Sequence, residues 1–294
     1  MSNEITFLIA GGDLRQIYAA KALAREFKVY AAGFDKNVVD FSGIEHIENI
    51  NDIKERVDYI VLPLPASNDG VFVNTPFSKQ NIPLTFLTSM LKDGGTVFGG
   101  KFDARTLRIF NKFGVDTVDY FEREELNVLN AVPTAEGAVQ IAMEEMASTI
   151  YGRRILITGM GRISKVLVKI LQGMSADVTV AARKYSDLSW AEIYGCRTVH
   201  TSELAESIEN YELIFNTVPA LLFDDKILKR ADRDVLIIDL SSKPGGVDFE
   251  AAGGIGLKVV WALSLPGKVA PISAGEIIAL TVLNILKERG GADD

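Results

Sequence analysis

Cysteine and histidine are nearly absent from the 294-residue sequence, which contains one cysteine, Cys196, and two histidines. A single cysteine excludes an intramolecular disulfide and a metal site built from several cysteines. The sequence also lacks the run of about 18 to 20 apolar residues that a membrane-spanning helix needs. The N-terminus is typical of an acidic lead into a strand rather than of a signal peptide, so we expect a cytoplasmic protein.

An excess of positive charge is absent as well, since the formal net charge at pH 7 is -8. Proteins that bind nucleic acids or membrane surfaces generally need a positive field to recruit phosphate groups, so both classes are disfavoured. The sequence is 48% hydrophobic and 9% aromatic, which is typical of a globular protein. Its length fits two domains of about 130 to 160 residues each.

Short apolar runs alternate with helical patterns in the first half of the chain. The expected strands are Ile5–Ala10, Lys28–Ala32, Asp58–Leu62 and Thr96–Phe98, and the expected helices are Leu14–Phe27 and Ala104–Phe113. Strands separated by helices favour a parallel sheet with helices on its faces. We therefore predict an α/β domain of flavodoxin or Rossmann type, on the substrate side, over residues 1–130.

The alternation breaks at Asn130–Thr134. Because proline is a helix stop signal, Pro133 is expected to precede a long helix that starts at Thr134 and runs to about Tyr151. This helix would link the first domain to a second one over residues 131–294.

The second half repeats the alternation, and six or seven strands are implied. The expected strands are Arg154–Thr158, Asp177–Ala181, Arg197–His200, Glu212–Asn216, Val235–Leu240 and Lys258–Trp261, with a helix at Ile163–Leu171. A closing helix over about 273–289 is apolar at helical spacing and ends in basic residues and glycine. Whether this helix packs back on the first domain is left open.

A glycine-rich turn follows the first strand of the second half. The strand runs directly into Gly159, Met160, Gly161, Arg162, Ile163 and Ser164, and a helix comes next. In a Rossmann dinucleotide site the first glycine permits the sharp turn, the second lets the main chain approach the pyrophosphate, and N–H groups at the helix start meet the anion. Ser164 stands where a third glycine or alanine is usual, a departure that we expect to affect only helix packing. We predict a cofactor site here.

The end of the next strand, about 20 residues beyond the glycines, distinguishes the two nicotinamide dinucleotides. A carboxylate there accepts hydrogen bonds from the ribose of NAD and repels the 2′-phosphate of NADP, which arginine binds instead. This sequence has Ala182 followed by Arg183 and Lys184. We therefore predict NADP(H) rather than NAD(H).

Further cofactor contacts are expected from loops at the carboxyl ends of the later strands, where ligands bind in such sheets. The residues singled out are Asn216, Thr217, Val218, Pro219, Leu240, Ser241, Pro266 and Gly267. The last two lie in a loop that would flank the nicotinamide.

Acid–base residues of the familiar dehydrogenases are missing. His46 and His200 both lie in strand-like segments and are expected to be structural, which disfavours the histidine-dependent 2-hydroxy-acid dehydrogenases. No Tyr-x-x-x-Lys motif occurs either, which disfavours short-chain dehydrogenases. Cationic and polar residues at strand ends remain as catalytic candidates: Asp13, Arg15, Lys101, Glu136 and Lys243.

These candidates suit an anionic substrate. Gly11-Gly12 lies at a strand-to-helix turn and could offer N–H groups to a carboxylate. Thr134 and Glu136 either contact the substrate or cap the helix that starts there.

Several motifs together resemble those of the dipicolinate synthase A-subunit family, over nearly the whole chain. They are Ala10–Gln16, Leu62–Pro65, Pro133–Ala138, Gly159–Arg162, Asp239–Gly246 and Leu265–Pro271. The second half also resembles the nicotinamide domains of 2-hydroxy-acid dehydrogenases and adenosylhomocysteine hydrolase.

The resemblance implies oxidation of a dihydrodipicolinate to dipicolinate with NADP+ in the mother cell of a sporulating bacterium. The dihydro compound would arise by loss of water from a hydroxy-tetrahydro precursor of the lysine pathway. A flavoprotein-like B subunit is implied as partner, and we also expect a homo-oligomer. Arg15, Lys101 and Lys243 would engage the two carboxylates of the substrate, with Glu136 or Asp13 as proton acceptor. Two alternatives stay open: another NADP-dependent dehydrogenase, of the shikimate or methylene-tetrahydrofolate type, and a non-catalytic NADP(H)-sensing subunit.

Overall fold

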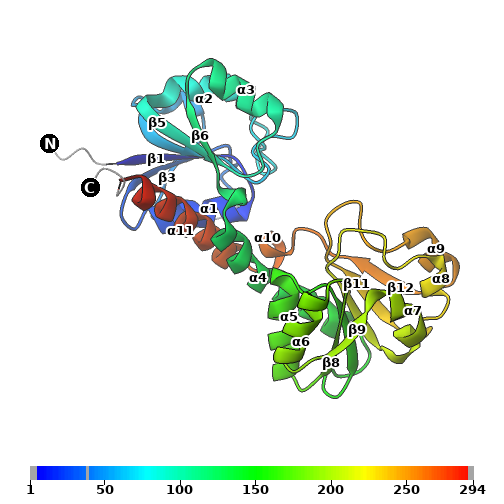
Figure 1. Ribbon diagram of the computed structural model, residues 1–294. Helices are drawn as coiled ribbons and strands as arrows, with labels where there is room; N and C mark the ends of the chain where they lie inside the picture. The colour runs from blue at the N-terminus through cyan, green and yellow to red at the C-terminus, as the bar shows by residue number, and fades with distance from the viewer. Residues whose placement is uncertain (1–4, 38–39, 291–294) are drawn as a thin grey trace. The chain divides into compact units, whose positions relative to one another are not determined.

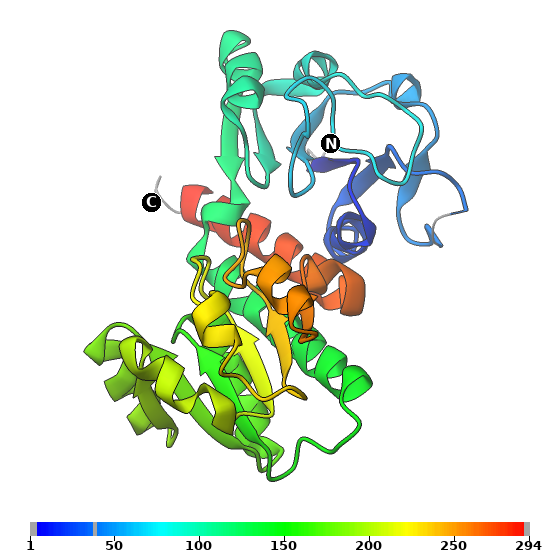
Figure 2. The same ribbon diagram turned by 90° about the vertical axis from the view of Figure 1, so that its right-hand side faces the viewer.

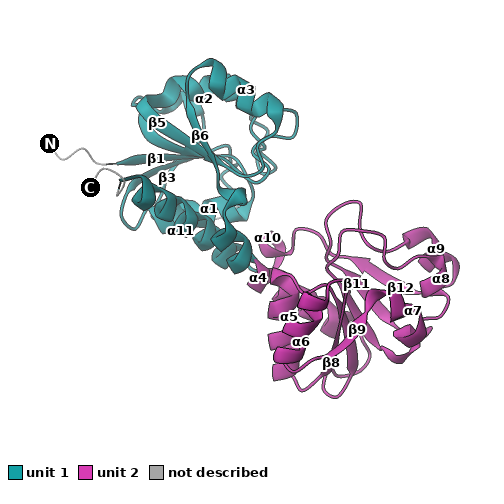
Figure 3. Ribbon diagram, in the orientation of Figure 1, with its two compact units in different colours: residues 1–130, 270–294 teal, residues 131–269 magenta. Residues whose placement is uncertain are grey.

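The computed structural model describes residues 5–37 and 40–290. The chain divides into two compact units, one holding the described residues of 1–130 and 270–294 and the other residues 131–269 (Figure 3). The change of unit after Asn130 falls inside helix α4 (Glu124–Glu145). The closing helix α11 (Pro271–Gly290) belongs to the first unit, so the second unit ends at Val269 and not at the C-terminus.

The first unit is built on a parallel six-stranded sheet. Its strands are β1 (Thr6–Ala10), β2 (Lys28–Ala32), β3 (Glu45–Ile47), β4 (Val57–Val61), β5 (Leu91–Gly99) and β6 (Asp116–Asp119). Their order in the sheet is β3-β2-β1-β4-β5-β6. This is the Rossmann order rather than the flavodoxin one, a choice that the sequence had left open. The order reverses between β1 and β4, where ligands of such sheets usually bind.

Helices cover both faces of the first sheet. Helices α1 (Leu14–Leu23) and α11, with the start of α4, pack on the face that carries Phe7 and Ile9. The other face carries Leu8 and is covered by α2 (Leu84–Met90) and α3 (Ala104–Lys112). Alternate residues of β1 therefore point into two separate cores, as expected for a strand buried on both faces.

Helix α11 lies alongside α1, far from it in sequence (Figures 1 and 2). Gly275 makes this close approach feasible, because a Cβ atom there would lie 2.4 Å from the main-chain oxygen of Arg15. The C-terminal helix thus helps to fix the start of α1, where two of the predicted site residues lie.

The second unit repeats the architecture. Its strands are β7 (Arg154–Thr158), β8 (Asp177–Ala182), β9 (Arg197–His200), β10 (Leu213–Asn216), β11 (Leu236–Asp239) and β12 (Lys258–Trp261). Their order, β12-β11-β10-β7-β8-β9, is again the Rossmann order, with the reversal between β7 and β10. The predicted parallel α/β architecture is confirmed for both halves.

The sheet of the second unit also separates two cores. Helices α4, α5 (Arg162–Gly173), α6 (Tyr185–Ile193) and α10 (Leu265–Val269) contribute to the core on one face. The other face is covered by α7 (Leu204–Ser207), α8 (Asp225–Leu228) and α9 (Phe249–Gly254). The described residues also form four short 3-10 helices: η1 (Ile50–Asp52), η2 (Tyr120–Glu122), η3 (Thr201–Glu203) and η4 (Ile208–Asn210).

The predicted start of the linking helix was wrong. Helix α4 begins at Glu124, ten residues before Thr134, and continues through Pro133 to Glu145. A proline inside a helix costs about 3 kcal/mol because it removes one hydrogen bond and crowds the preceding turn. Leu126 is buried in the core of the first unit and Ala135 in that of the second, so packing on either side of Pro133 outweighs this local cost.

Two smaller expectations also need correction. The segment that contains Pro266 and Gly267 is not a loop but the short helix α10. Strand β6 and helix α2 were not among the predicted elements of the first half, because short elements give weak sequence signals, whereas the strand-like segment around His46 is strand β3. Within the described ranges, every helix is too short or too polar to cross a lipid bilayer.

Candidate functional site

The glycine turn of the second unit begins directly after β7. Gly159 has a φ of +86°, and its N–H donates to the main-chain oxygen of Ala181 at 2.8 Å. A Cβ atom at this position would lie 2.9 Å from Thr217 Oγ1 and 3.1 Å from Val218 Cγ2. Both the backbone conformation and the space therefore require glycine.

Nothing in the described chain requires glycine at position 161. The φ of Gly161, -81°, suits any residue, and a Cβ atom there would meet no atom of the described chain within 4 Å. The residue caps the N-terminus of α5, whose first N–H groups point out of the helix. Open space at this end of a 12-residue helix fits the pyrophosphate of a dinucleotide. Of the neighbouring predicted residues, Met160 is buried, Ile163 half-buried and Arg162 exposed.

Ser164 does more than the packing role expected of it. Thr217 Oγ1 donates to the main-chain oxygen of Thr158 at 2.8 Å, so its single proton is used. The 2.9 Å contact between Ser164 Oγ and Thr217 Oγ1 is therefore donated by Ser164. This chain of hydrogen bonds joins helix α5 to the ends of β7 and β10, beneath the glycine turn.

The end of β8 carries the residues expected to select NADP(H). Ala182 is buried, whereas Arg183 and Lys184 are exposed. Neither basic side chain forms an ion pair with a carboxylate of the described chain, so both charges are available to an anion. Helix α6 starts directly after Lys184.

Sequence reasoning did not predict the buried polar network at the ends of β7, β10 and β11. Asp239 is fully buried and accepts hydrogen bonds from Asn216 Nδ2 at 2.7 Å, Ser241 N at 3.0 Å, Ser241 Oγ at 2.7 Å and Gly246 N at 2.8 Å. Asn216 Oδ1 in turn accepts from Thr158 Oγ1 at 2.5 Å and Val218 N at 3.2 Å. The network fixes the two loops that were predicted to line the cofactor crevice.

The predicted loop residues lie at the carboxyl edge of the second sheet to different depths. Asn216 is fully buried within the network and supports the loop from below. Leu240 and Ser241 are nearly buried, Thr217, Val218, Pro266 and Gly267 are half-buried, and Pro219 is exposed.

The glycine turn of the first unit is closed by the chain itself. Gly11 N–H donates to Ala32 at 2.8 Å and Gly12 N–H donates to Asn74 at 2.8 Å, in both cases to main-chain oxygen. A Cβ atom at Gly11 would lie 2.7 Å from the same oxygen of Asn74. The expectation that these N–H groups bind a substrate carboxylate was therefore wrong, because a segment about sixty residues downstream uses one of them.

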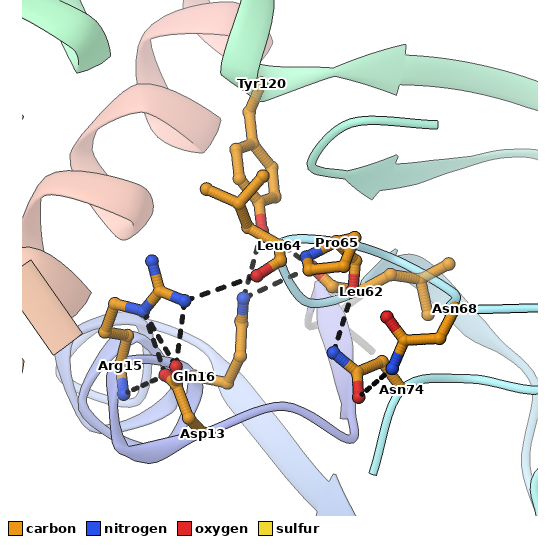
Figure 4. A network of polar contacts seen from close by, with 9 residues as sticks. All are labelled: Asp13, Arg15, Gln16, Leu62, Leu64, Pro65, Asn68, Asn74 and Tyr120. Carbon is orange, nitrogen blue, oxygen red and sulfur yellow. Dashed lines mark hydrogen bonds and ion pairs between the residues drawn. The ribbon is translucent and has the colours of Figure 1, made fainter. Parts of the chain in front are cut away.

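Next to this turn, Arg15 and Asp13 form an ion pair (Figure 4). Asp13 caps α1 through Arg15 N and accepts hydrogen bonds from Arg15 Nε at 2.9 Å and Nη2 at 2.8 Å. Arg15 Nη2 also donates to the Leu64 oxygen at 3.3 Å. Burial by itself would lower the pKa of Arg15, but the hydrogen bonds and charge of Asp13 outweigh it and raise that pKa. Arg15 Nη1 makes no hydrogen bond to the described residues.

A second set of contacts holds the loop after β4 in place. Tyr120 OH donates to Leu62 O at 2.9 Å and accepts from Gln16 Nε2 at 3.0 Å. Tyr120 is fully buried, and burial raises its pKa, so the phenol remains a donor. Asn74 Nδ2 donates to Pro65 O at 3.4 Å, and Asn74 Oδ1 accepts from Asn68 at 3.0 Å (Figure 4). These contacts hold together the segments that follow β1, β4 and β6, near the point where the strand order reverses.

Lys101 follows β5 at the same edge of the first sheet. It has a φ of +56°, which is unusual for a residue with a side chain. The Asp119 carboxylate holds this conformation by accepting from Lys101 N at 3.0 Å and Phe102 N at 2.9 Å. The lysine side chain is exposed and makes no ion pair within the described residues.

Glu136 and Lys243 belong to the second unit. Glu136 is exposed on α4, well inside the helix, so it does not cap a helix start. Lys243 is exposed in the loop after β11. The structure therefore brings Asp13 and Arg15 into contact and places Lys101 on the same sheet edge.

Comparisons with known proteins identify the family of the chain. The profile of the N-terminal domain of the dipicolinate synthase A-subunit matches residues 6–121. The dipicolinate synthase A-subunit of Bacillus subtilis is 30% identical over 291 residues, covering 98% of each chain. The chain belongs to the dipicolinate synthase A-subunit family. The resemblance noted from the sequence motifs is thereby confirmed.

Solved structures of this family share the whole fold. The A chain of dipicolinate synthase from B. subtilis matches with a TM-score of 0.87 at 30% identity, covering 99% of each chain. Its counterpart from Bacillus halodurans matches with a TM-score of 0.85 at 30% identity, over 96% of this chain and 97% of that one. A transhydrogenase from Sinorhizobium meliloti, 14% identical with a TM-score of 0.68 over 96% and 94% of the two chains, shows that the fold extends beyond the family.

Proposed function

We propose that the chain is an NADP-dependent oxidoreductase that converts a dihydrodipicolinate into dipicolinate. The observation that carries the proposal is the second glycine turn, open at Gly161, next to a strand end with Arg183 and Lys184, neither of which pairs with a carboxylate among the described residues. In a chain of the dipicolinate synthase A-subunit family, this combination favours NADP(H) over NAD(H), since no carboxylate follows β8 directly.

We propose that the second unit binds and orients the cofactor. The first N–H groups of α5 would hold the pyrophosphate, and Arg183 would pair with the 2′-phosphate. Loops fixed by Asp239 would border the nicotinamide. When bound, the nicotinamide ring accepts the hydride that the dihydro ring loses as it becomes aromatic.

In the first unit we assign Arg15 and Lys101 to the carboxylates of the substrate. Arg15 Nη1 makes no hydrogen bond in the part of the chain that the structure describes, and the paired Asp13 holds the guanidinium rigidly, which lowers the entropy lost on binding. Lys101 brings an exposed ammonium to the same sheet edge. Because aromatisation favours hydride loss, the protein has only to orient the ring and accept one proton.

Two candidates of the second unit, Lys243 and Glu136, are also proposed. Lys243 is assigned to a carboxylate of the substrate. Glu136 is the better proton acceptor of the two candidates, because both oxygens of Asp13 already accept hydrogen bonds from Arg15.

The biological setting is proposed by relation to the family. The relatives are named as an A-subunit, which implies a partner of another kind, and we propose self-association of this chain and binding of a B subunit. We place the reaction in the cytoplasm of the mother cell during sporulation, on a branch of the lysine pathway.

The test uses the full chain with NADP+ and freshly generated 4-hydroxy-tetrahydrodipicolinate, with and without the B subunit. We expect the absorbance of reduced nicotinamide to rise together with dipicolinate. Cofactor binding without turnover in either condition would contradict the proposal and would favour another substrate or a sensing role.

Two variants separate the proposed sites. Arg15→Ala should raise the substrate concentration needed for half-maximal rate while leaving NADPH affinity unchanged, and unaltered kinetics would remove Arg15 from the site. Arg183→Ala should weaken binding of NADPH and not of NADH, because it deletes only the partner of the 2′-phosphate. Equal weakening of both would refute that role.

A further inference from the structure

His200 links the loops that follow two neighbouring strands. Its Nε2 atom lies 2.9 Å from the main-chain oxygen of Arg183, directly after β8. Its Nδ1 atom lies 3.3 Å from Ser202 N and 2.6 Å from Ser202 Oγ, at the start of η3. In the sheet, His200 pairs with Ala182, the residue before Arg183.

These contacts define the form of the imidazole. A carbonyl oxygen only accepts and a main-chain N–H only donates, so Nε2 carries the proton and Nδ1 is the acceptor. This is the neutral tautomer with both nitrogens engaged. His200 therefore has no free ring nitrogen for a phosphate and acts through the main chain that it holds.

The aromatic ring of Tyr185 adds to this support. It stacks on the His200 ring with centroids 5.3 Å apart and planes 21° apart, although Tyr185 is 76% exposed. The segment from Arg183 to Tyr185 is thus held at both ends by one histidine: by a hydrogen bond at Arg183 and by ring contact at Tyr185.

We propose that His200 is a positioning residue for discrimination between NADP(H) and NAD(H), because it fixes the main chain from which Arg183 and Lys184 project. The inference rests on the proposed function, in which these two basic residues meet the 2′-phosphate. Without the tether, the basic side chains would have to be ordered when the cofactor binds, and this entropy cost falls only on the ligand that carries the phosphate.

Gln and Asn substitutions distinguish the two nitrogens of the ring. The amide nitrogen of Gln extends as far as Nε2 and can donate to the Arg183 oxygen, whereas that of Asn reaches only the place of Nδ1. Leu removes both contacts at similar volume. The matched control is His46→Leu: His46 Nε2 contacts the Phe34 oxygen at 2.8 Å in the first unit, which does not contain the proposed cofactor turn.

Dissociation constants of NADPH and NADH are measured on the full-length wild type and each variant by titration of nicotinamide fluorescence. We expect His200→Leu and His200→Asn to weaken NADPH binding roughly tenfold, about 1.4 kcal/mol, with less than twofold change for NADH. His200→Gln should restore NADPH affinity to within about threefold of wild type, about 0.7 kcal/mol. His46→Leu should leave the ratio of the two constants unchanged.

The outcomes separate the inference from the proposed function. A wild type that binds NADH as tightly as NADPH would overturn the cofactor assignment itself. A wild type that prefers NADPH, with His200→Leu keeping the same preference or weakening both ligands equally, would overturn only the role of His200.

Discussion

Replacing Gly161 by alanine isolates the contribution of the glycine turn to cofactor binding, because the added methyl group meets no atom of the described chain within 4 Å. The backbone φ of -81° is accessible to alanine. Alanine is a poorer helix cap than glycine, but it also reduces the entropy of the unfolded chain, so the free energy of unfolding should change by less than about 1 kcal/mol.

Binding should respond very differently. The methyl group would occupy the space that we assign to the pyrophosphate, and inserting one extra carbon into a close-packed contact costs about 1–3 kcal/mol, or roughly 5- to 150-fold in affinity. NADPH and NADH should be affected alike, because both carry the pyrophosphate. Nicotinamide fluorescence gives the dissociation constants, and urea unfolding gives the stability.

Gly159→Ala is the variant with which Gly161→Ala is compared. With a φ of +86° and a neighbour at 2.9 Å, its added methyl group should lower stability as well as affinity. If Gly161→Ala binds NADPH as the wild type does, the cofactor does not approach this turn and the assignment of the site fails.

Three further expectations concern the stability of the first unit. Lys101→Gly should be more stable than Lys101→Ala by about 0.5–1 kcal/mol in urea unfolding, because only glycine relieves the left-handed backbone; equal stability would argue against strain. Gly275→Ala should cost about 1–3 kcal/mol, because its Cβ would lie 2.4 Å from a main-chain oxygen of α1, while Gly173→Ala, with no atom within 4 Å, should not; equal effects would contradict the packing argument. Burial raises the pKa of Asp58, but hydrogen bonds, chiefly from Lys92, outweigh it and lower that pKa. The stability advantage of the wild type over Asp58→Asn should thus be present above about pH 4 and shrink as the pH falls further, and a constant difference would refute the linkage.

Local signals in the sequence were sufficient where one short segment determines the structure. The strand that runs into Gly159, the helix that follows it and the basic residues after Ala182 are all encoded within about thirty residues, and each was predicted in place. The parallel sheets also follow from the alternation of apolar runs and helical patterns.

Sequence reasoning failed where contacts between distant segments determine the local structure. Asn74 closes the turn at Gly12 from far along the chain, and no pattern around Gly12 indicates it. Pro133 was interpreted by its local preference, whereas burial of Ala135 keeps the helix intact. His200 was expected to be structural, but its partner Arg183 is 17 residues away, directly after the neighbouring strand, so the tether could not be predicted from spacing.

The two units share a glycine turn but differ in the space beyond it. In each, a glycine at positive φ follows the first strand and donates to the end of the second: Gly11 to Ala32 and Gly159 to Ala181, both at 2.8 Å. What differs is the space beyond the turn, which the chain fills near Asn74 in the first unit and leaves open at Gly161 in the second. A filled turn cannot receive a pyrophosphate, and we therefore propose that the first sheet edge binds a smaller anion through side chains instead of helix N–H groups. Under the proposed function, the same topology binds a dinucleotide at one switch point and a small carboxylate ligand at the other.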